Sequence, residues 1–178
     1  ALILAGNACL HLGAGWTILE MLDPASARAD ENQPELMIRL ASTDAQELLK
    51  TNQPDVIAIG PGLGKSALAS QYLYAALHFP NSPLVIDADA LNLISESDDL
   101  LAALHKRNSS FPELTVITPH PGEAAKLLKI STEAIQANRL DAIHKLVELT
   151  QSIVVLKGQH TLIASPIHPP VQCLAGNP

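Results

Sequence analysis

The residues best suited to chemistry follow four apolar runs that are typical of buried strands. The runs end at Gly60-Pro61-Gly62-Leu63-Gly64, Asp87-Ala88-Asp89, Pro119-His120-Pro121-Gly122-Glu123 and Lys157-Gly158. If the strands are parallel, these four endings meet at one rim of a sheet, which is where open α/β sheets place their ligand clefts. Glycine amides, carboxylates, a histidine and a lysine at one rim could bind a phosphate-bearing ligand locally. Their convergence carries more weight than any one of the four endings.

The glycine-rich ending fits neither common phosphate motif. The phosphate-loop pattern needs glycine at position 59, which is Ile59, and the dinucleotide fingerprint needs its third glycine at position 65, which is Lys65. A glycine turn after a buried strand lets the backbone approach a ligand closely, but it can also serve tight packing. Both interpretations of Gly60–Gly64 stay open.

The polar endings also have structural alternatives. Asp87 and Asp89 could hold a metal ion, orient a sugar hydroxyl or cap the next helix. His120 and Glu123 lie where Pro121 begins a helix with free amides, a place that favours anions, although an ordinary strand-to-helix turn has the same residues. The Lys157 ammonium could offset phosphate charge or simply be solvated.

Composition limits the class of protein. The chain has 178 residues, 47% of them hydrophobic and 16% charged, which suits one compact domain over residues 1–178. Its formal charge of −7 offers no general field for nucleic acid or an anionic membrane, and no apolar run is long enough for a membrane span. Cys9 and Cys173 lack metal-ligand spacing and fit a reducing compartment. Nucleophile-elbow and zinc patterns are absent from the sequence.

The periodicity predicts strands that alternate with helices. Thr43 with Gln46 has capping-box spacing and predicts a short helix to about Lys50. One long helix is expected over 132–149, with Leu140, Ile143, Leu146 and Val147 facing inward. A helix is predicted after Gly64, with Leu68, Tyr72, Ala76 and Phe79 on one stripe. Helices are also predicted at 1–12, 90–94, 98–107 and 121–129, and strands at 16–19, 36–38, 55–59, 84–86, 114–118, 153–156, 161–164 and 171–173. Because the central strands are uniformly apolar, we expect an α/β fold with a mostly parallel sheet covered by helices.

Five motifs occur in the order found in one family. They are Ile59-Gly60-Pro61-Gly62-Leu63-Gly64, Val85-Ile86-Asp87-Ala88-Asp89-Ala90-Leu91, Thr118-Pro119-His120-Pro121-Gly122-Glu123, Leu156-Lys157-Gly158 and Gly176-Asn177-Pro178. Over essentially its whole length the chain resembles the ADP/ATP-dependent NAD(P)H-hydrate dehydratases of the ribokinase-like superfamily. His120-x-x-Glu123 is similar to the Asn-x-x-Glu element of that superfamily, with histidine in place of asparagine.

The resemblance implies a ribokinase-like three-layer α/β/α fold and a reaction. Such enzymes repair the S-epimer of NADH or NADPH hydrate: ADP or ATP phosphorylates the added hydroxyl, and loss of phosphate restores the reduced cofactor. The resemblance assigns Glu123 to the Mg²⁺ and phosphate region. It assigns the hydrate to Ala1, Gly62, Gly64, Asp87 and His120, and the adenine nucleotide to Lys157, Gly158, Gln159, His160 and Thr161.

The sequence also departs from the family pattern. The family's glycine-rich stretch before the first helix and its Gly-x-Gly-Asp segment after Asn-Pro are missing here. The aspartate of that segment activates the hydroxyl, so we expect a fragment truncated at both ends and inactive as given.

Several properties of the natural protein follow from the resemblance as expectations. They are a cytoplasmic location, a homo-oligomer and a possible fused epimerase domain. The preferences between ADP and ATP and between NADH and NADPH hydrate stay open. So do two other functions: a kinase of the same superfamily acting on a hydroxymethylpyrimidine, thiazole or sugar, and a non-catalytic adenine-nucleotide-binding protein.

Overall fold

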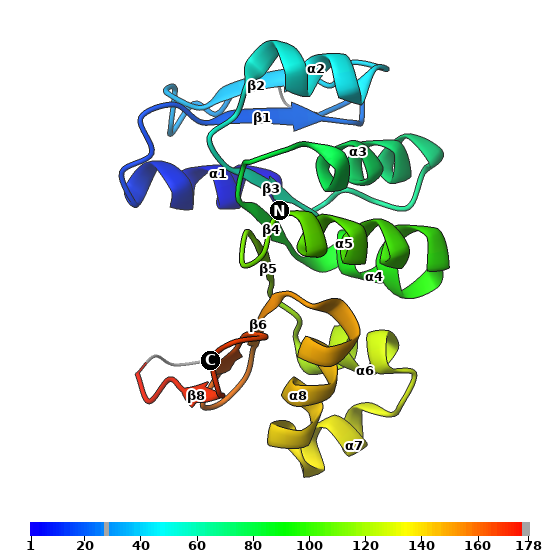
Figure 1. The fold of residues 1–178 in the computed structure, drawn as a ribbon. Helices are drawn as coiled ribbons and strands as arrows, with labels where there is room; N and C mark the ends of the chain where they lie inside the picture. The colour runs from blue at the N-terminus through cyan, green and yellow to red at the C-terminus, as the bar shows by residue number, and fades with distance from the viewer. Residues whose placement is uncertain (27–28, 176–178) are drawn as a thin grey trace.

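The larger of the two sheets has six strands in the order β3-β4-β5-β6-β7-β8 (Figure 1). The computed structural model describes residues 1–26 and 29–175, so the Gly176-Asn177-Pro178 motif lies outside the described residues. The strands are β3 (Ile57–Ile59), β4 (Leu84–Ile86), β5 (Thr115–Ile117), β6 (Ile153–Leu156), β7 (Leu162–Ala164) and β8 (Val171–Gln172). Neighbours from β3 to β6 are parallel, and β6, β7 and β8 pair antiparallel. The predicted α/β fold with a mostly parallel sheet is therefore confirmed.

The N-terminal part of the chain forms a second, smaller sheet. Its strands β1 (Ile18–Met21) and β2 (Met37–Leu40) pair in parallel and have a small apolar cluster of their own around Leu19 and Leu36. Helix α1 (Leu2–His11) packs on β1 through its buried Gly6, where an added Cβ would lie 2.8 Å from a methyl carbon of Leu19. Helix α2 (Ala45–Asn52) then leads to β3.

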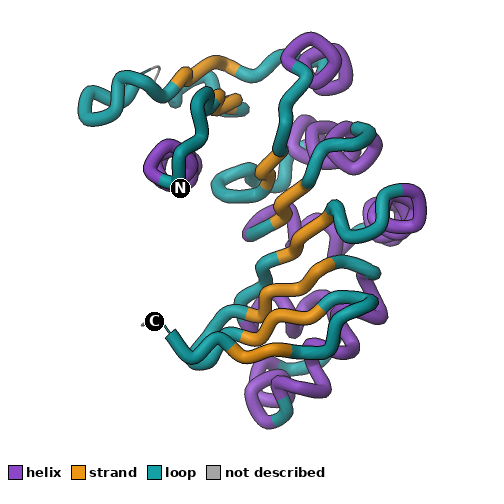
Figure 2. Tube along the Cα trace, turned by 60° about the vertical axis from the view of Figure 1, so that its left-hand side comes forward, coloured by secondary structure: helices purple, strands orange, loops and turns teal. Residues whose placement is uncertain are grey.

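The helices that follow β3 gather on one side of the six-stranded sheet (Figure 2). They are α3 (Ala67–His78), α4 (Ala88–Glu96), α5 (Asp98–Ser110), α6 (Pro121–Leu128), α7 (Thr132–Ala137) and α8 (Arg139–Thr150). Burial alternates along the strands to match: Leu84 and Ile86 are fully buried, whereas Val85 between them is half-buried. The largest fully buried side chains are Leu73, Leu84, Ile86, Leu91, Ile94, Leu104, Ile117, Ile135, Ile143, Leu146, Leu156 and Val154.

Two helix predictions were wrong in detail. The single helix over 132–149 is two helices, because Asn138 leaves helical geometry and its side chain caps α8 by accepting from the Asp141 N–H at 3.1 Å. Leu140 is consequently exposed rather than facing inward. Helix α2 is capped by Asp44, which accepts from the Glu47 N–H, and not by Thr43.

Within residues 1–26 and 29–175, no helix combines the length and the apolar character that crossing a bilayer requires.

Candidate functional site

The carboxyl ends of four parallel strands lie side by side and form one rim of the sheet. Gly60 follows β3, Asp87 follows β4, and Lys157 follows β6. Backbone hydrogen bonds continue the ladder past the strand ends: Asp87 N–H donates to the Ile59 carbonyl at 3.1 Å, and Lys157 N–H donates to the Pro119 carbonyl at 2.9 Å. The predicted convergence of the strand ends is therefore confirmed.

An ion pair crosses this rim. The Lys157 ammonium donates to Asp87 Oδ1 at 2.7 Å and lies 4.0 Å from Glu123 Oε2. The Glu123 side chain is almost fully buried, whereas the other two are partly exposed. Lys157 is thus neither freely solvated nor unpaired. Two carboxylates surround one ammonium, so this cluster carries excess negative charge.

Neither Asp87 nor Asp89 caps helix α4 with its side chain. Asp87 is the N-terminal flanking residue of α4 but makes no side-chain capping bond, because its carboxylate faces Lys157. Asp89 Oδ2 instead accepts from the Gly64 N–H at 2.8 Å, so it fastens the glycine turn. The capping alternative for both residues is thereby excluded.

His120 and Glu123 form a reciprocal capping box at the start of α6. His120 Nδ1 accepts from the Gly122 N–H at 2.9 Å and from the Glu123 N–H at 3.3 Å, and Glu123 Oε2 accepts from the His120 N–H at 2.8 Å. Because Nδ1 accepts, the proton of the neutral ring is on Nε2. The expectation of free helix amides was wrong here, since the imidazole already occupies two of them.

The Gly60–Gly64 turn serves packing at one end and is open at the other. A Cβ on Gly60 would lie 1.7 Å from the Asp87 carbonyl oxygen, and its φ of 129° excludes other residues. Gly64 also has a positive φ, but a Cβ there would meet no atom within 4 Å. A ligand can therefore approach the backbone at Gly64, while Gly60 packs β3 against the end of β4.

The turn from Lys157 to Thr161 connects β6 with β7. Gly158, Gln159 and His160 are exposed, and the Thr161 hydroxyl donates to the Gly158 carbonyl at 3.0 Å. Arg139 from the start of α8 holds the beginning of this turn by donating to the Leu156 and Lys157 carbonyls. Arg139 was not predicted as a site residue, because backbone acceptors leave no side-chain pattern in the sequence that would reveal it.

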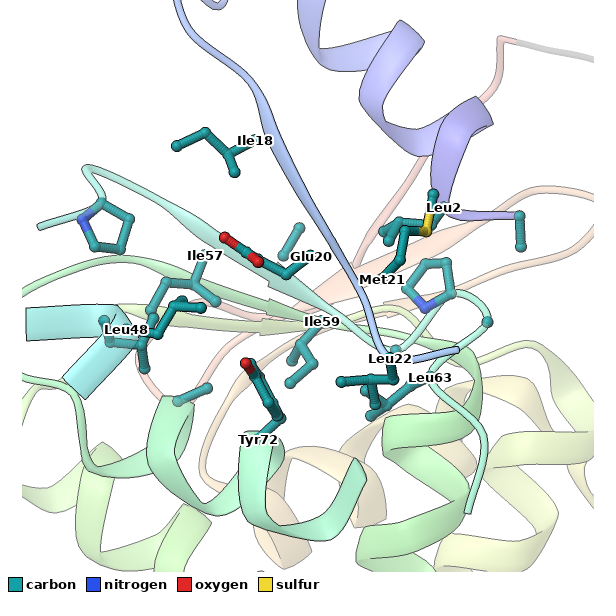
Figure 3. A pocket seen from close by; sticks show the side chains of 18 of the residues that line it. Leu2, Ile18, Glu20, Met21, Leu22, Leu48, Ile57, Ile59, Leu63 and Tyr72 are labelled. Carbon is teal, nitrogen blue, oxygen red and sulfur yellow. The ribbon is translucent and has the colours of Figure 1, made fainter. Parts of the chain in front are cut away.

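A cavity lies beside the rim, not on it. It has a volume of about 430 Å³ and lies between β1, α2, β3 and α3, with a mostly aliphatic lining (Figure 3). Ala1 and Gly62 line it and are neighbours, since an added Cβ on Gly62 would lie 3.6 Å from that of Ala1. Asp87, His120 and Lys157 do not line it. The structure therefore divides the predicted hydrate-binding residues between the cavity and the rim.

Two ionisable side chains in the cavity have perturbed pKa values. Burial raises the pKa of Glu20 despite the opposing charge of Arg39, and Glu20 Oε1 has no hydrogen-bond partner among the described residues. Burial, with a contribution from the Glu20 charge, raises the pKa of Tyr72 to about 12, and the Tyr72 hydroxyl donates to the Ser42 carbonyl at 2.8 Å. Figure 3 shows both side chains pointing into the same space.

The rim does not form a ready cage for a metal ion. Among residues 1–26 and 29–175, no three His, Cys, Asp or Glu side chains are grouped at metal-binding distances. Mg²⁺ usually takes one or two carboxylates and fills its other positions with water and ligand phosphates. The excess carboxylates around Lys157 fit that mode, in which a nucleotide would bring most of the ligands.

The fold places the protein among ribokinase-like α/β proteins. The structure of a ribokinase-like superfamily protein from Enterococcus faecalis matches it with a TM-score of 0.70 at 32% identity, over 99% of this chain and 59% of that one. An ADP/ATP-dependent NAD(P)H-hydrate dehydratase from Bacillus subtilis, co-crystallised with ATP and Mg²⁺, has the same fold, with a TM-score of 0.68 at 24% identity over 99% of this chain and 61% of that one.

The sequence defines the group more closely: residues 1–178 match the Carb_kinase family, the NAD(P)H-hydrate dehydratases, and the chain belongs to it. It is 38% identical to the bifunctional NAD(P)H-hydrate repair enzyme Nnr of Coxiella burnetii, over 100% of this chain and 34% of that protein. It is 34% identical to the ADP-dependent (S)-NAD(P)H-hydrate dehydratase of Neisseria meningitidis, over 92% of this chain and 53% of that protein. The chain thus spans between a third and about half of these two relatives.

Proposed function

We propose that the protein repairs nicotinamide nucleotides by dehydrating the S-epimer of NADH or NADPH hydrate at the expense of ADP or ATP. The observation that carries this proposal is the rim, where Lys157 lies between Asp87 and Glu123 and the glycine turn that follows β3 is open at Gly64. The relatives' names supply the substrate, and the rim supplies groups suited to phosphoryl transfer.

The proposed roles follow the division between rim and cavity. Ala1, Gly62 and Gly64 would line the hydrate site with His120 and Asp87, because the glycine turn connects the cavity with the rim. His120 Nδ1 is used in capping, and Nε2 lies 3.4 Å from Glu123 Oε1, so a ligand that accepts from the Nε2–H would share this donor with the Glu123 carboxylate. The exposed turn from Lys157 to Thr161 would bind the adenine nucleotide through backbone groups and the Lys157 ammonium.

Phosphoryl transfer needs positioning and charge stabilisation more than covalent chemistry from the protein. The hydrate hydroxyl would take the terminal phosphoryl group of the nucleotide, and phosphate would then leave together with a proton of the neighbouring carbon to restore the double bond. Lys157 would offset charge on the transferring group. Mg²⁺, held through water or phosphate near Glu123 and Asp87, would supply further charge neutralisation.

We assign Asp87 to binding and not to proton abstraction. Its carboxylate accepts from the Lys157 ammonium at 2.7 Å, so it is placed to orient a ligand beside that cation. The family resemblance assigns the base to the aspartate of a Gly-x-Gly-Asp segment, which is not among residues 1–178. We further propose a cytoplasmic, homo-oligomeric protein of one ribokinase-like domain over these residues, with a fused epimerase domain as the arrangement to test.

A substrate panel with the full-length protein tests the proposed activity. NADH hydrate, NADPH hydrate, a hydroxymethylpyrimidine, a hydroxyethylthiazole and a sugar alcohol are each incubated with ADP or ATP and Mg²⁺, and phosphate and product are measured. We expect turnover of the hydrates. Phosphorylation of another alcohol without hydrate turnover would instead identify a small-molecule kinase, and nucleotide binding without any turnover would identify a nucleotide-binding protein.

A further inference from the structure

Arg139 holds the peptide that begins the exposed turn after β6. Its Nη2 donates to the Leu156 carbonyl at 3.0 Å, and Nη1 and Nη2 both donate to the Lys157 carbonyl at 3.3 Å. The opposite side of the same segment is fixed by the bond from the Lys157 N–H to the Pro119 carbonyl. The segment is therefore fixed between the end of β5 and the start of α8.

Gly158 is shaped to fit this guanidinium. Its φ is 139°, a conformation that other residues avoid, and a Cβ at this position would lie 2.8 Å from Arg139 Nη1. A larger residue would push the guanidinium away from the two carbonyls. The glycine and the arginine thus form one structural unit, although 19 positions separate them.

The direction of the Gly158 N–H follows from this arrangement. The described residues contain no cis peptide bond, and in a trans peptide the N–H points opposite to the carbonyl of the same unit. Since the Lys157 carbonyl points at Arg139, the Gly158 N–H points away from it, on an exposed turn. Among the described residues this N–H has no hydrogen-bond partner. An oriented backbone N–H beside a lysine is a common means of binding an anion.

We propose that Arg139 is a positioning residue for the nucleotide, which orients the Lys157–Gly158 peptide so that its N–H binds a phosphate oxygen. This inference rests on the proposed function, because it takes the turn from Lys157 to Thr161 as the nucleotide site. Arg139 acts through the peptide, since its own donors are directed at the carbonyls. Bonding the Leu156 and Lys157 carbonyls together requires the planar arrangement of N–H donors of a guanidinium, which a lysine ammonium cannot reproduce.

The test measures ADP and adenosine binding to the full-length protein by calorimetry, for wild type, Arg139→Met and Arg139→Lys. Arg139→Met should weaken ADP binding about tenfold or more, in the range of a lost hydrogen bond to a charged group, and change adenosine binding less than threefold. Arg139→Lys keeps the charge but should recover little of the ADP affinity. Lys145→Met is the matched control, because it removes a cation from the same helix, where Lys145 pairs with Asp141 at 2.7 Å.

The outcomes separate this inference from the proposed function. Wild-type ADP affinity in Arg139→Met would overturn the positioning role and leave the proposed function standing. Full recovery by Arg139→Lys, or equal loss in Lys145→Met, would overturn it too, because charge alone would then explain the effect. Absence of both ADP and ATP binding by wild type would overturn the proposed function and this inference with it. Because Arg139→Met could also loosen the fold, thermal unfolding is measured in parallel. The inference would be wrong if Arg139→Met lost both stability and ADP affinity while a stably folded Arg139→Lys bound ADP as tightly as wild type.

Discussion

The Lys157 ammonium lies 2.7 Å from Asp87 Oδ1, although 70 positions separate the two residues in the sequence. This ion pair joins the ends of β4 and β6 across β5, which lies between them in the sheet. It therefore connects a residue assigned to the hydrate with one assigned to the nucleotide. A nucleotide phosphate that binds Lys157 would compete with Asp87 for the same ammonium.

Lys157→Met should weaken ADP binding more than hydrate binding. A partly desolvated contact between ammonium and phosphate contributes about 1.5–3 kcal/mol, whereas an exposed pair contributes under about 1 kcal/mol. Removing Lys157 also leaves Asp87 and Glu123 without their shared cation. The two carboxylates would then repel the phosphate more strongly. Calorimetric titration of ADP and of hydrate measures both effects, with Lys145→Met as the control. Equal ADP affinities in Lys157→Met and wild type would leave Lys157 with a structural role alone.

Asp87→Asn should have opposite effects on the two ligands. Without Mg²⁺, ADP should bind about three- to tenfold more tightly, because the substitution frees Lys157 and removes a negative charge. Hydrate binding should weaken, since the carboxylate no longer accepts from the substrate. Titrations with and without Mg²⁺ distinguish competition for Lys157 from a loss of metal binding. Weaker ADP binding in the absence of Mg²⁺ would contradict the competition.

His120 substitutions separate capping from ligand binding. His120→Ala removes the acceptor for two amides of α6 and should cost about 1 kcal/mol of stability. His120→Asn should keep most of that stability, since asparagine is a favoured capping residue, yet it loses the Nε2–H donor. Both variants should therefore bind hydrate weakly, while only His120→Ala unfolds earlier in denaturant. Wild-type hydrate affinity in His120→Asn would restrict His120 to capping.

Glu20→Gln should change the pH dependence of stability. The folded state raises the pKa of Glu20, so the stability linked to its protonated form is full below the unfolded pKa and is lost as pH rises through the folded pKa. The variant avoids this loss and should be more stable than wild type at neutral pH, by about 1 kcal/mol or less. It should also lower the pKa of Tyr72, since the Glu20 charge contributes to the elevation.

Thermal unfolding between about pH 4 and pH 7 tests the effect on stability. A separate alkaline titration of tyrosine absorbance tests the effect on the pKa of Tyr72. Glu148→Gln, which changes an exposed carboxylate on α8, is the control. Identical pH profiles for Glu20→Gln and wild type would show that the cavity does not desolvate Glu20.

The sequence predicted the rim because apolar runs identify strands and polar residues mark where those strands end. It could not predict the breaks that depend on which of several polar residues caps a helix, as at Asn138 and at Asp44 beside Thr43. His120 as a capping residue was missed because histidine is outside the usual set of caps. Arg139 was missed for a different reason: its partners are carbonyls of residues that come near it only once α8 has packed against β6.

Product analysis with the full-length protein tests the proposed dehydration of NADH hydrate. The purified S-epimer of NADH hydrate is incubated with ADP and Mg²⁺, and NADH, AMP and phosphate are quantified in the same sample. We expect the three products to form in equal amounts and none to form without ADP, unless ATP replaces ADP and yields ADP in place of AMP. NADH formation without nucleotide consumption, or nucleotide consumption that leaves the hydrate intact, would contradict it.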